Sequence, residues 1–123
     1  MRKLNFVFVL ITLFVFTNCV NAQKTAELKI KTSAQCGMCK DRIEKAMAYE
    51  TGIVSTNLDL VTKDLNVVYK PTKTTPDKVR IALTKIGYQA DEFKADPIAY
   101  EALPPCCKIP EEGTKTDHKD CKH

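Results

Sequence analysis

The segment TSAQCGMCKDRIEKAM, Thr32–Met47, carries two cysteines, Cys36 and Cys39, that are separated by two residues. Cysteines at this spacing can bind a soft metal ion, form a disulfide or act as a redox couple. Two thiolates are enough to hold Cu(I), Hg(II) or Ag(I) in linear or near-linear coordination. Zn(II) normally takes four ligands, so this pair alone would leave a zinc site incomplete. The spacing by itself leaves these chemistries open.

The apolar pattern around the pair changes from that of a strand to that of a helix. Apolar and charged residues alternate over Ala26–Ile30, which predicts a half-buried strand. From Cys39 to Met47 the apolar residues recur at helical spacing, so a helix is expected to begin near Cys39. The unpaired N–H groups of a helix N-terminus, together with the cation of Lys40, favour the thiolate form there.

A hairpin and a second helix follow. Alternation predicts two strands over residues 54–60 and 65–69, joined by the short turn VTKD. Thr75 is suited to cap a helix whose first residue is Pro76. Gly87 is expected to end that helix.

Residues 88–93 are expected to form a fourth strand. The resulting order over Lys24–Phe93 is β-α-β-β-α-β. This order predicts an α+β ferredoxin-like sandwich, in which two helices lie on one face of a four-stranded antiparallel sheet. A C-terminal tail containing Cys and His residues follows this unit.

The motif CGMC, in the first loop of a βαββαβ pattern, resembles the heavy-metal-associated domain family. That family includes copper chaperones, copper-ATPase N-terminal modules and the periplasmic mercury-binding protein. The segments TGIVSTNLDLVTKDLNVVY and KIGYQA resemble its hairpin and the exit of its second helix. The resemblance implies that Cys36 and Cys39 bind the metal and that Tyr88 lies near it. The family usually has Met two residues before the first cysteine, where this chain has Ala34; Met38 is a further candidate beside the metal.

The N-terminus has the pattern of an export signal. Arg2 and Lys3 precede an uncharged apolar stretch that is short for a membrane span. The segment VNAQ supplies residues that a signal peptidase prefers before a cut at Gln23. We therefore expect residues 1–22 to be a signal peptide and the protein to be exported to the periplasm. Lipid attachment at Cys19 and an uncleaved anchor are the alternatives.

Residues 23–94 then form the expected heavy-metal-associated domain, and residues 95–123 form an extension with a short helix from Pro97 and a mobile tail. Five cysteines remain after cleavage, so they cannot all pair within one chain. The extension offers further candidate ligands, which are Cys106, Cys107, His118, Cys121 and His123. They are expected either to bind metal or to form disulfides. One hypothesis is that Cys106 and Cys107 fold back to complete a three- or four-thiolate site.

Charge and composition exclude several classes of function. Removing Arg2 and Lys3, one positive charge each, lowers the formal net charge from +4 to +2, and no basic block is interleaved with aromatic residues. Nucleic acid is therefore not an expected partner. The chain shows no paired catalytic carboxylates, phosphate loop or nucleophile with a plausible His, so an enzyme is not expected.

The expected function is that of an exported metallochaperone or metal buffer. It would hold Cu(I) and pass it by ligand exchange to a metal-transporting membrane protein or another metal-binding domain. We expect a monomer, with a metal-bridged dimer as the alternative. The rival functions are a mercury-scavenging protein, a thiol–disulfide oxidoreductase that uses Cys36 and Cys39 as its redox pair, and an interaction module whose cysteines are all bridged.

Overall fold

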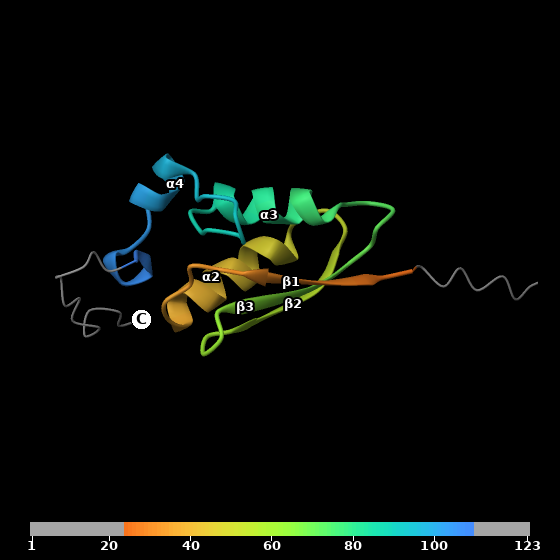
Figure 1. Cartoon of the computed structure of the whole chain (residues 1–123), viewed down its shortest axis with the longest axis horizontal. Helices are drawn as coiled ribbons and strands as arrows, with labels where there is room; N and C mark the ends of the chain where they lie inside the picture. The colour runs from red at the N-terminus through yellow and green to blue at the C-terminus, as the bar shows by residue number, and fades with distance from the viewer. Residues whose placement is uncertain (1–23, 110–123) are drawn as a thin grey trace, which may run out of the picture.

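The computed structural model describes residues 24–109 (Figure 1). Its elements, in chain order, are β1 (Ala26–Lys31), α2 (Gly37–Ala48), β2 (Ile53–Asp59), β3 (Asp64–Tyr69), α3 (Pro76–Lys85), α4 (Pro97–Glu101) and the 3-10 helix η2 (Pro105–Cys107). The expected signal peptide, residues 1–22 with Cys19, lies outside the described residues, as does the expected mobile tail with His118, Cys121 and His123. Among residues 24–109, no helix is long and apolar enough to cross a bilayer.

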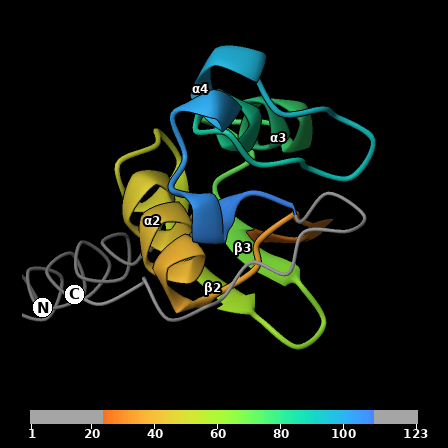
Figure 2. The same ribbon diagram turned by 90° about the vertical axis from the view of Figure 1, so that its left-hand side faces the viewer.

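The three strands form an antiparallel sheet in the order β1-β3-β2. Helices α2 and α3 lie on the same side of this sheet (Figures 1 and 2). The register places Ile30 and Leu58 opposite Leu65 from either side. All three are buried, and they meet Ile43 of α2 and Leu83 of α3 in one core. The alternation seen in the sequence thus selects the sheet face that the helices cover.

Residues 88–93 do not form the fourth strand that the sequence suggests. Among the described residues this segment makes only isolated bridges, in which Ala90 pairs with Thr32 and with Phe93. The chain turns back at Asp91, whose φ of 51° lies in the left-handed region. Aspartate tolerates that conformation better than most residues do. A residue with positive φ cannot continue an extended strand, so no strand runs through Asp91.

The Asp91 side chain takes over part of the pairing that a fourth strand would make. Its Oδ1 accepts a hydrogen bond from the Lys31 N–H at the end of β1, at 2.8 Å. Its Oδ2 lies 2.8 Å from the Arg80 guanidinium on α3. This hydrogen bond is the main reason why the pKa of Arg80 is raised. Asp91 therefore ties the end of β1 to α3 and fixes the loop that carries Tyr88.

The residues beyond the sheet pack onto the domain rather than away from it. Helix α4 begins at Pro97, where the sequence predicts it, and Asp96 Oδ1 caps it by accepting the Ala99 N–H at 2.9 Å. The Asp96 N–H donates to the Thr84 carbonyl at the end of α3, at 3.0 Å. Leu103 is then only 5% exposed. The described part of the extension thus contributes Leu103 and Cys107 to the core, while α4 itself has no buried residue.

Gly87 allows this packing. It follows α3 with a φ of +95°, and a Cβ at this position would lie 2.8 Å from the Ala99 carbonyl oxygen and 3.1 Å from Leu103 Cγ. A glycine is therefore needed both for the backbone conformation and for the close approach of α4.

We expect Gly87→Ala to lower the free energy of unfolding by about 1–3 kcal/mol, because a side chain at positive φ is strained and the new Cβ collides with α4. Denaturant unfolding followed by circular dichroism measures the change. Gly37→Ala is the matched control: nothing lies within 4 Å of its Cβ position, so stability should stay level or rise slightly. Equal stability of Gly87→Ala and the unmodified protein would contradict this account.

Candidate metal centre

The loop between β1 and α2 places the two cysteines of the motif side by side. Helix α2 begins at Gly37, two residues earlier than the sequence pattern indicates, so Cys36 is its N-cap and Cys39 lies in its first turn. The Cys36 side chain caps no backbone N–H, which leaves its sulfur for other contacts. The two Sγ atoms are 3.5 Å apart. One ion can therefore contact both sulfurs.

Cys39 is fully buried, yet its thiol is easier to ionise than usual. Burial opposes ionisation, but hydrogen bonds from the backbone at Gln35, from the Cys107 thiol and from the backbone at Cys36 outweigh it and lower the pKa of Cys39. The thiolate is the form that binds metal. The backbone groups of the helix start therefore prepare this sulfur for metal binding, as the sequence suggests.

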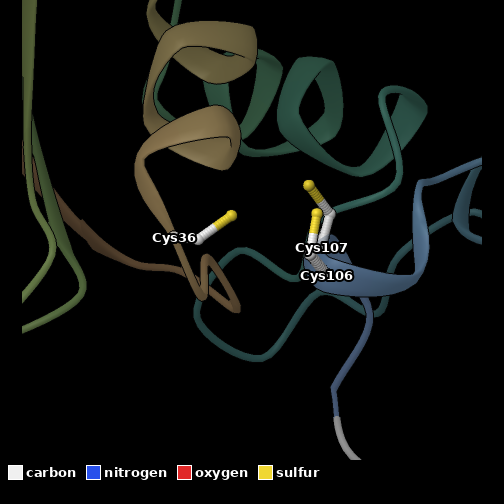
Figure 3. Close-up of side chains that lie close together, drawn as sticks. All are labelled: Cys36, Cys106 and Cys107. Carbon is white, nitrogen blue, oxygen red and sulfur yellow. The ribbon is translucent and has the colours of Figure 1, made fainter. Parts of the chain in front are cut away.

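A third free thiol, Cys107, lies against this pair. It is 1% exposed, and burial together with a hydrogen bond to Cys39 raises its pKa to about 12. In the metal-free protein a neutral Cys107 thiol thus faces a Cys39 that ionises readily. The sulfurs of Cys36, Cys106 and Cys107 all lie within 4.8 Å of one another. Figure 3 shows Cys36 pointing from the start of α2 toward the two cysteines of η2.

Tyr88 closes the cluster from inside the protein. It is fully buried, and its hydroxyl has no hydrogen-bond partner of standard geometry among the described residues. The thiols of Cys39 and Cys107 are the polar groups that lie near it. Burial and the charge on Cys39 raise the pKa of Tyr88, so the hydroxyl keeps its proton and remains a donor. A buried donor beside sulfurs can stabilise negative charge on them.

Residues 33–89 match the family profile described as the heavy-metal-associated domain. These residues form a heavy-metal-associated domain. A copper-exporting P-type ATPase of Staphylococcus aureus is 36% identical over 69 residues, which are 56% of this chain but only 8% of the ATPase. The chain thus spans a small part of that relative.

Solved structures agree on the fold of the domain. Oxidized MerP from Ralstonia metallidurans CH34 superposes with a TM-score of 0.53 at 20% identity, over 55% of this chain and 96% of MerP. The water-soluble region of the P-type ATPase CopA from Bacillus subtilis gives 0.52 at 29% identity, over 55% of this chain and 46% of that region. The superposition on MerP supports the ferredoxin-like fold.

Lys40 and Met38, which neighbour the two cysteines in sequence, make other contacts in the structure. The Lys40 ammonium, expected to favour the thiolates, binds Glu44 at 2.7 Å and the Leu58 carbonyl at 2.6 Å, so it joins α2 to β2 instead. Met38 is half-buried and lines a surface groove along α2 with Tyr49. The contacts of these two side chains could not be predicted from the spacing of residues in the sequence, because they depend on which groups lie nearest in the folded chain.

Ala34 occupies a fully buried position in the middle of the loop between β1 and α2. A Met side chain there, as the family usually has, would need additional volume inside this core. The sequence indicates Ala34 as a departure from the family pattern and Cys107 as a candidate ligand. The burial of Leu103, which packs the extension onto the domain, was not predicted. The apolar residues of DPIAYEAL were the available signal for that contact.

We expect Tyr88→Phe to raise the free energy of unfolding of the metal-free protein by about 1 kcal/mol when the Cys39 thiol is protonated, because a buried polar group without a partner costs about 1–3 kcal/mol. Chemical denaturation at mildly acidic pH, in the presence of a metal chelator, measures this. Tyr100→Phe is the matched control: its hydroxyl accepts the Ile109 N–H at 3.0 Å, so its removal should lower stability by about 1 kcal/mol. A loss of stability in Tyr88→Phe would show that its hydroxyl is already satisfied.

Proposed function

We propose that this protein is an exported carrier or buffer of a soft metal ion, most simply Cu(I), which it holds between Cys36 and Cys39. The observation that carries the proposal is the pair of sulfurs 3.5 Å apart at the N-terminus of α2 in a heavy-metal-associated domain. Two thiolates satisfy a soft monovalent ion, and no acid–base machinery is required. The proposed role is therefore binding and transfer rather than catalysis.

Copper is favoured over the other soft ions by the comparison with the curated relatives. The Staphylococcus aureus protein that matches residues of this chain is described as a copper exporter. Ag(I) and Hg(II) have the same preference for thiolates, so mercury scavenging is the rival within the same site. Zn(II) is less suited, since the free thiols of the described residues number three and a structural zinc site takes four ligands.

Transfer would proceed by ligand exchange. Cys36 is the partly exposed sulfur of the pair, while Cys39 is buried, so a partner thiol would approach the ion from the side of Cys36. The ion would pass through a three-coordinate intermediate and leave Cys39 last. The partner in this proposal is a metal-transporting membrane protein or another metal-binding domain. The apolar N-terminal segment supports a periplasmic location, with lipid attachment at Cys19 as the alternative.

The redox alternative uses the same sulfurs. A separation of 3.5 Å is also compatible with a pair that closes to a disulfide, and a lowered pKa at Cys39 would help either chemistry. The heavy-metal-associated fold, with a single strand before the motif, favours metal binding. Reduction of insulin by the purified protein, without retention of metal, would favour the oxidoreductase.

The test is anaerobic Cu(I) loading in competition with a chromogenic Cu(I) chelator. We expect the unmodified chain to hold one Cu(I) per molecule and Cys36→Ser with Cys39→Ser to surrender it to the chelator, because the two sulfurs that define the site are gone. Met38→Leu is the matched control: it removes a nearby sulfur that lies in the α2 groove, and it should retain Cu(I) like the unmodified protein. Tight Cu(I) binding by the double variant would overturn the proposal. Preference for Hg(II) over Cu(I) in a direct competition would favour mercury scavenging as the function.

A further inference from the structure

The extension brings its own sulfur to the CGMC loop. After α4 the chain returns to the end of the domain where α2 begins, and η2 lies beside that helix start (Figures 1 and 2). The sulfurs of Cys36, Cys106 and Cys107 are mutually within 4.8 Å, although about seventy residues separate the motif from η2 in sequence. A heavy-metal-associated domain that ended at residue 94 would lack this third group.

Cys107 is the cysteine of η2 that can serve as a ligand. The free thiols of the described residues are Cys36, Cys39 and Cys107. Cys106 is disulfide-bonded, so its sulfur is not available as a thiolate ligand. The Cys107 thiol interacts with Cys39, which itself lies 3.5 Å from Cys36. The three free thiols consequently form one continuous cluster.

The extension is held so that Cys107 stays in place. Leu103 packs on Gly87, and the Tyr100 hydroxyl accepts the Ile109 N–H at 3.0 Å. Lys108 pairs with Glu101 at 2.9 Å and lies 5.8 Å from the centre of the Tyr100 ring. These contacts close the segment from α4 to residue 109 on itself. A ligand that is already positioned loses little conformational freedom when it binds.

The Tyr88 hydroxyl gives a second, independent indication. It is buried beside Cys39 and Cys107, and it has no partner of standard geometry in the described part of the chain. Buried polar groups without partners are uncommon and usually have a functional reason. Thiolates bound to a metal would accept the hydrogen bond that this hydroxyl has to offer. The packing of Cys107 as a mere apolar filler would leave the hydroxyl unexplained.

We propose that Cys107 is a third ligand of the metal, so that the ion lies in a three-sulfur set made by Cys36, Cys39 and Cys107. This rests on the proposed function, because it adds a ligand to the same site. The occupant is a thiophilic ion that accepts trigonal thiolate coordination, such as Cu(I) or Hg(II). As the bond from the Cys107 sulfur to the ion forms, its thiol proton passes to solvent. No oxidation or reduction is involved.

X-ray absorption spectroscopy of the full chain, loaded anaerobically with one equivalent of Cu(I), tests the proposal. We expect three sulfur neighbours in the unmodified protein and two, at a shorter mean Cu–S distance, in Cys107→Ala. Cu(I) affinity should fall by about tenfold or more in Cys107→Ala, since one metal–sulfur bond is lost. Cys106→Ser is the matched control and should keep three sulfur neighbours. Circular dichroism of the metal-free variants checks that each is folded.

A second variant keeps the test valid if Cys107→Ala folds poorly. Cys36→Ala should still bind Cu(I) through two sulfurs, those of Cys39 and Cys107. If Cys107 were not a ligand, Cys36→Ala would show only one sulfur neighbour of the ion, that of Cys39. Two sulfur neighbours in the unmodified protein, or an unchanged coordination number in Cys107→Ala, would overturn this inference and leave the two-thiolate carrier intact. Failure of the unmodified protein to bind Cu(I) or Hg(II) at all would overturn the proposed function itself.

Discussion

The burial of the Cys39 sulfur constrains everything at this end of the molecule. A group that must carry negative charge to bind metal lies where water does not reach it, so its charge has to be balanced by fixed neighbours. The start of α2 supplies backbone groups, the loop after α3 supplies Tyr88, and η2 supplies Cys107. Three separate segments are therefore fixed relative to one sulfur atom. Gly87 and Asp91 matter because they fix two of those segments.

The local parts of this arrangement were predictable from the sequence. The strand before the motif, the helix after it and the cap of α3 at Thr75 all follow from short-range periodicity and from residue types with strong positional preferences. The side-by-side placement of Cys36 and Cys39 follows in turn, because a loop that ends at a helix start keeps residues at this spacing on one side. Such features need no knowledge of the rest of the fold.

The parts that could not be predicted depend on contacts between distant segments. The extension could be suspected of folding back, but the burial of Leu103 and Cys107 depends on the close approach that Gly87 allows. The sequence predicts that Gly87 ends the helix, but it does not predict that α4 and Leu103 pack directly against this glycine. The fourth strand was expected from the apolar pattern of residues 88–93. It is replaced by a turn because the Asp91 carboxylate bonds both Lys31 and Arg80.

The turn at Asp91 also has a consequence for the sheet itself. Apart from the bridge at Thr32 and the hydrogen bonds between Lys31 and Asp91, the outer side of β1 has no partner in the described residues, so the outward backbone groups before Lys31 form an open edge. Open edges invite pairing with another chain. The exposed residues of β1 include Lys29 and Lys31, whose side chains are 67% and 62% exposed and would lose hydration or meet like charge in such a pairing. Because the fourth strand does not form, Lys29 and Lys31 are the exposed residues of β1 that disfavour edge-to-edge association of the sheet.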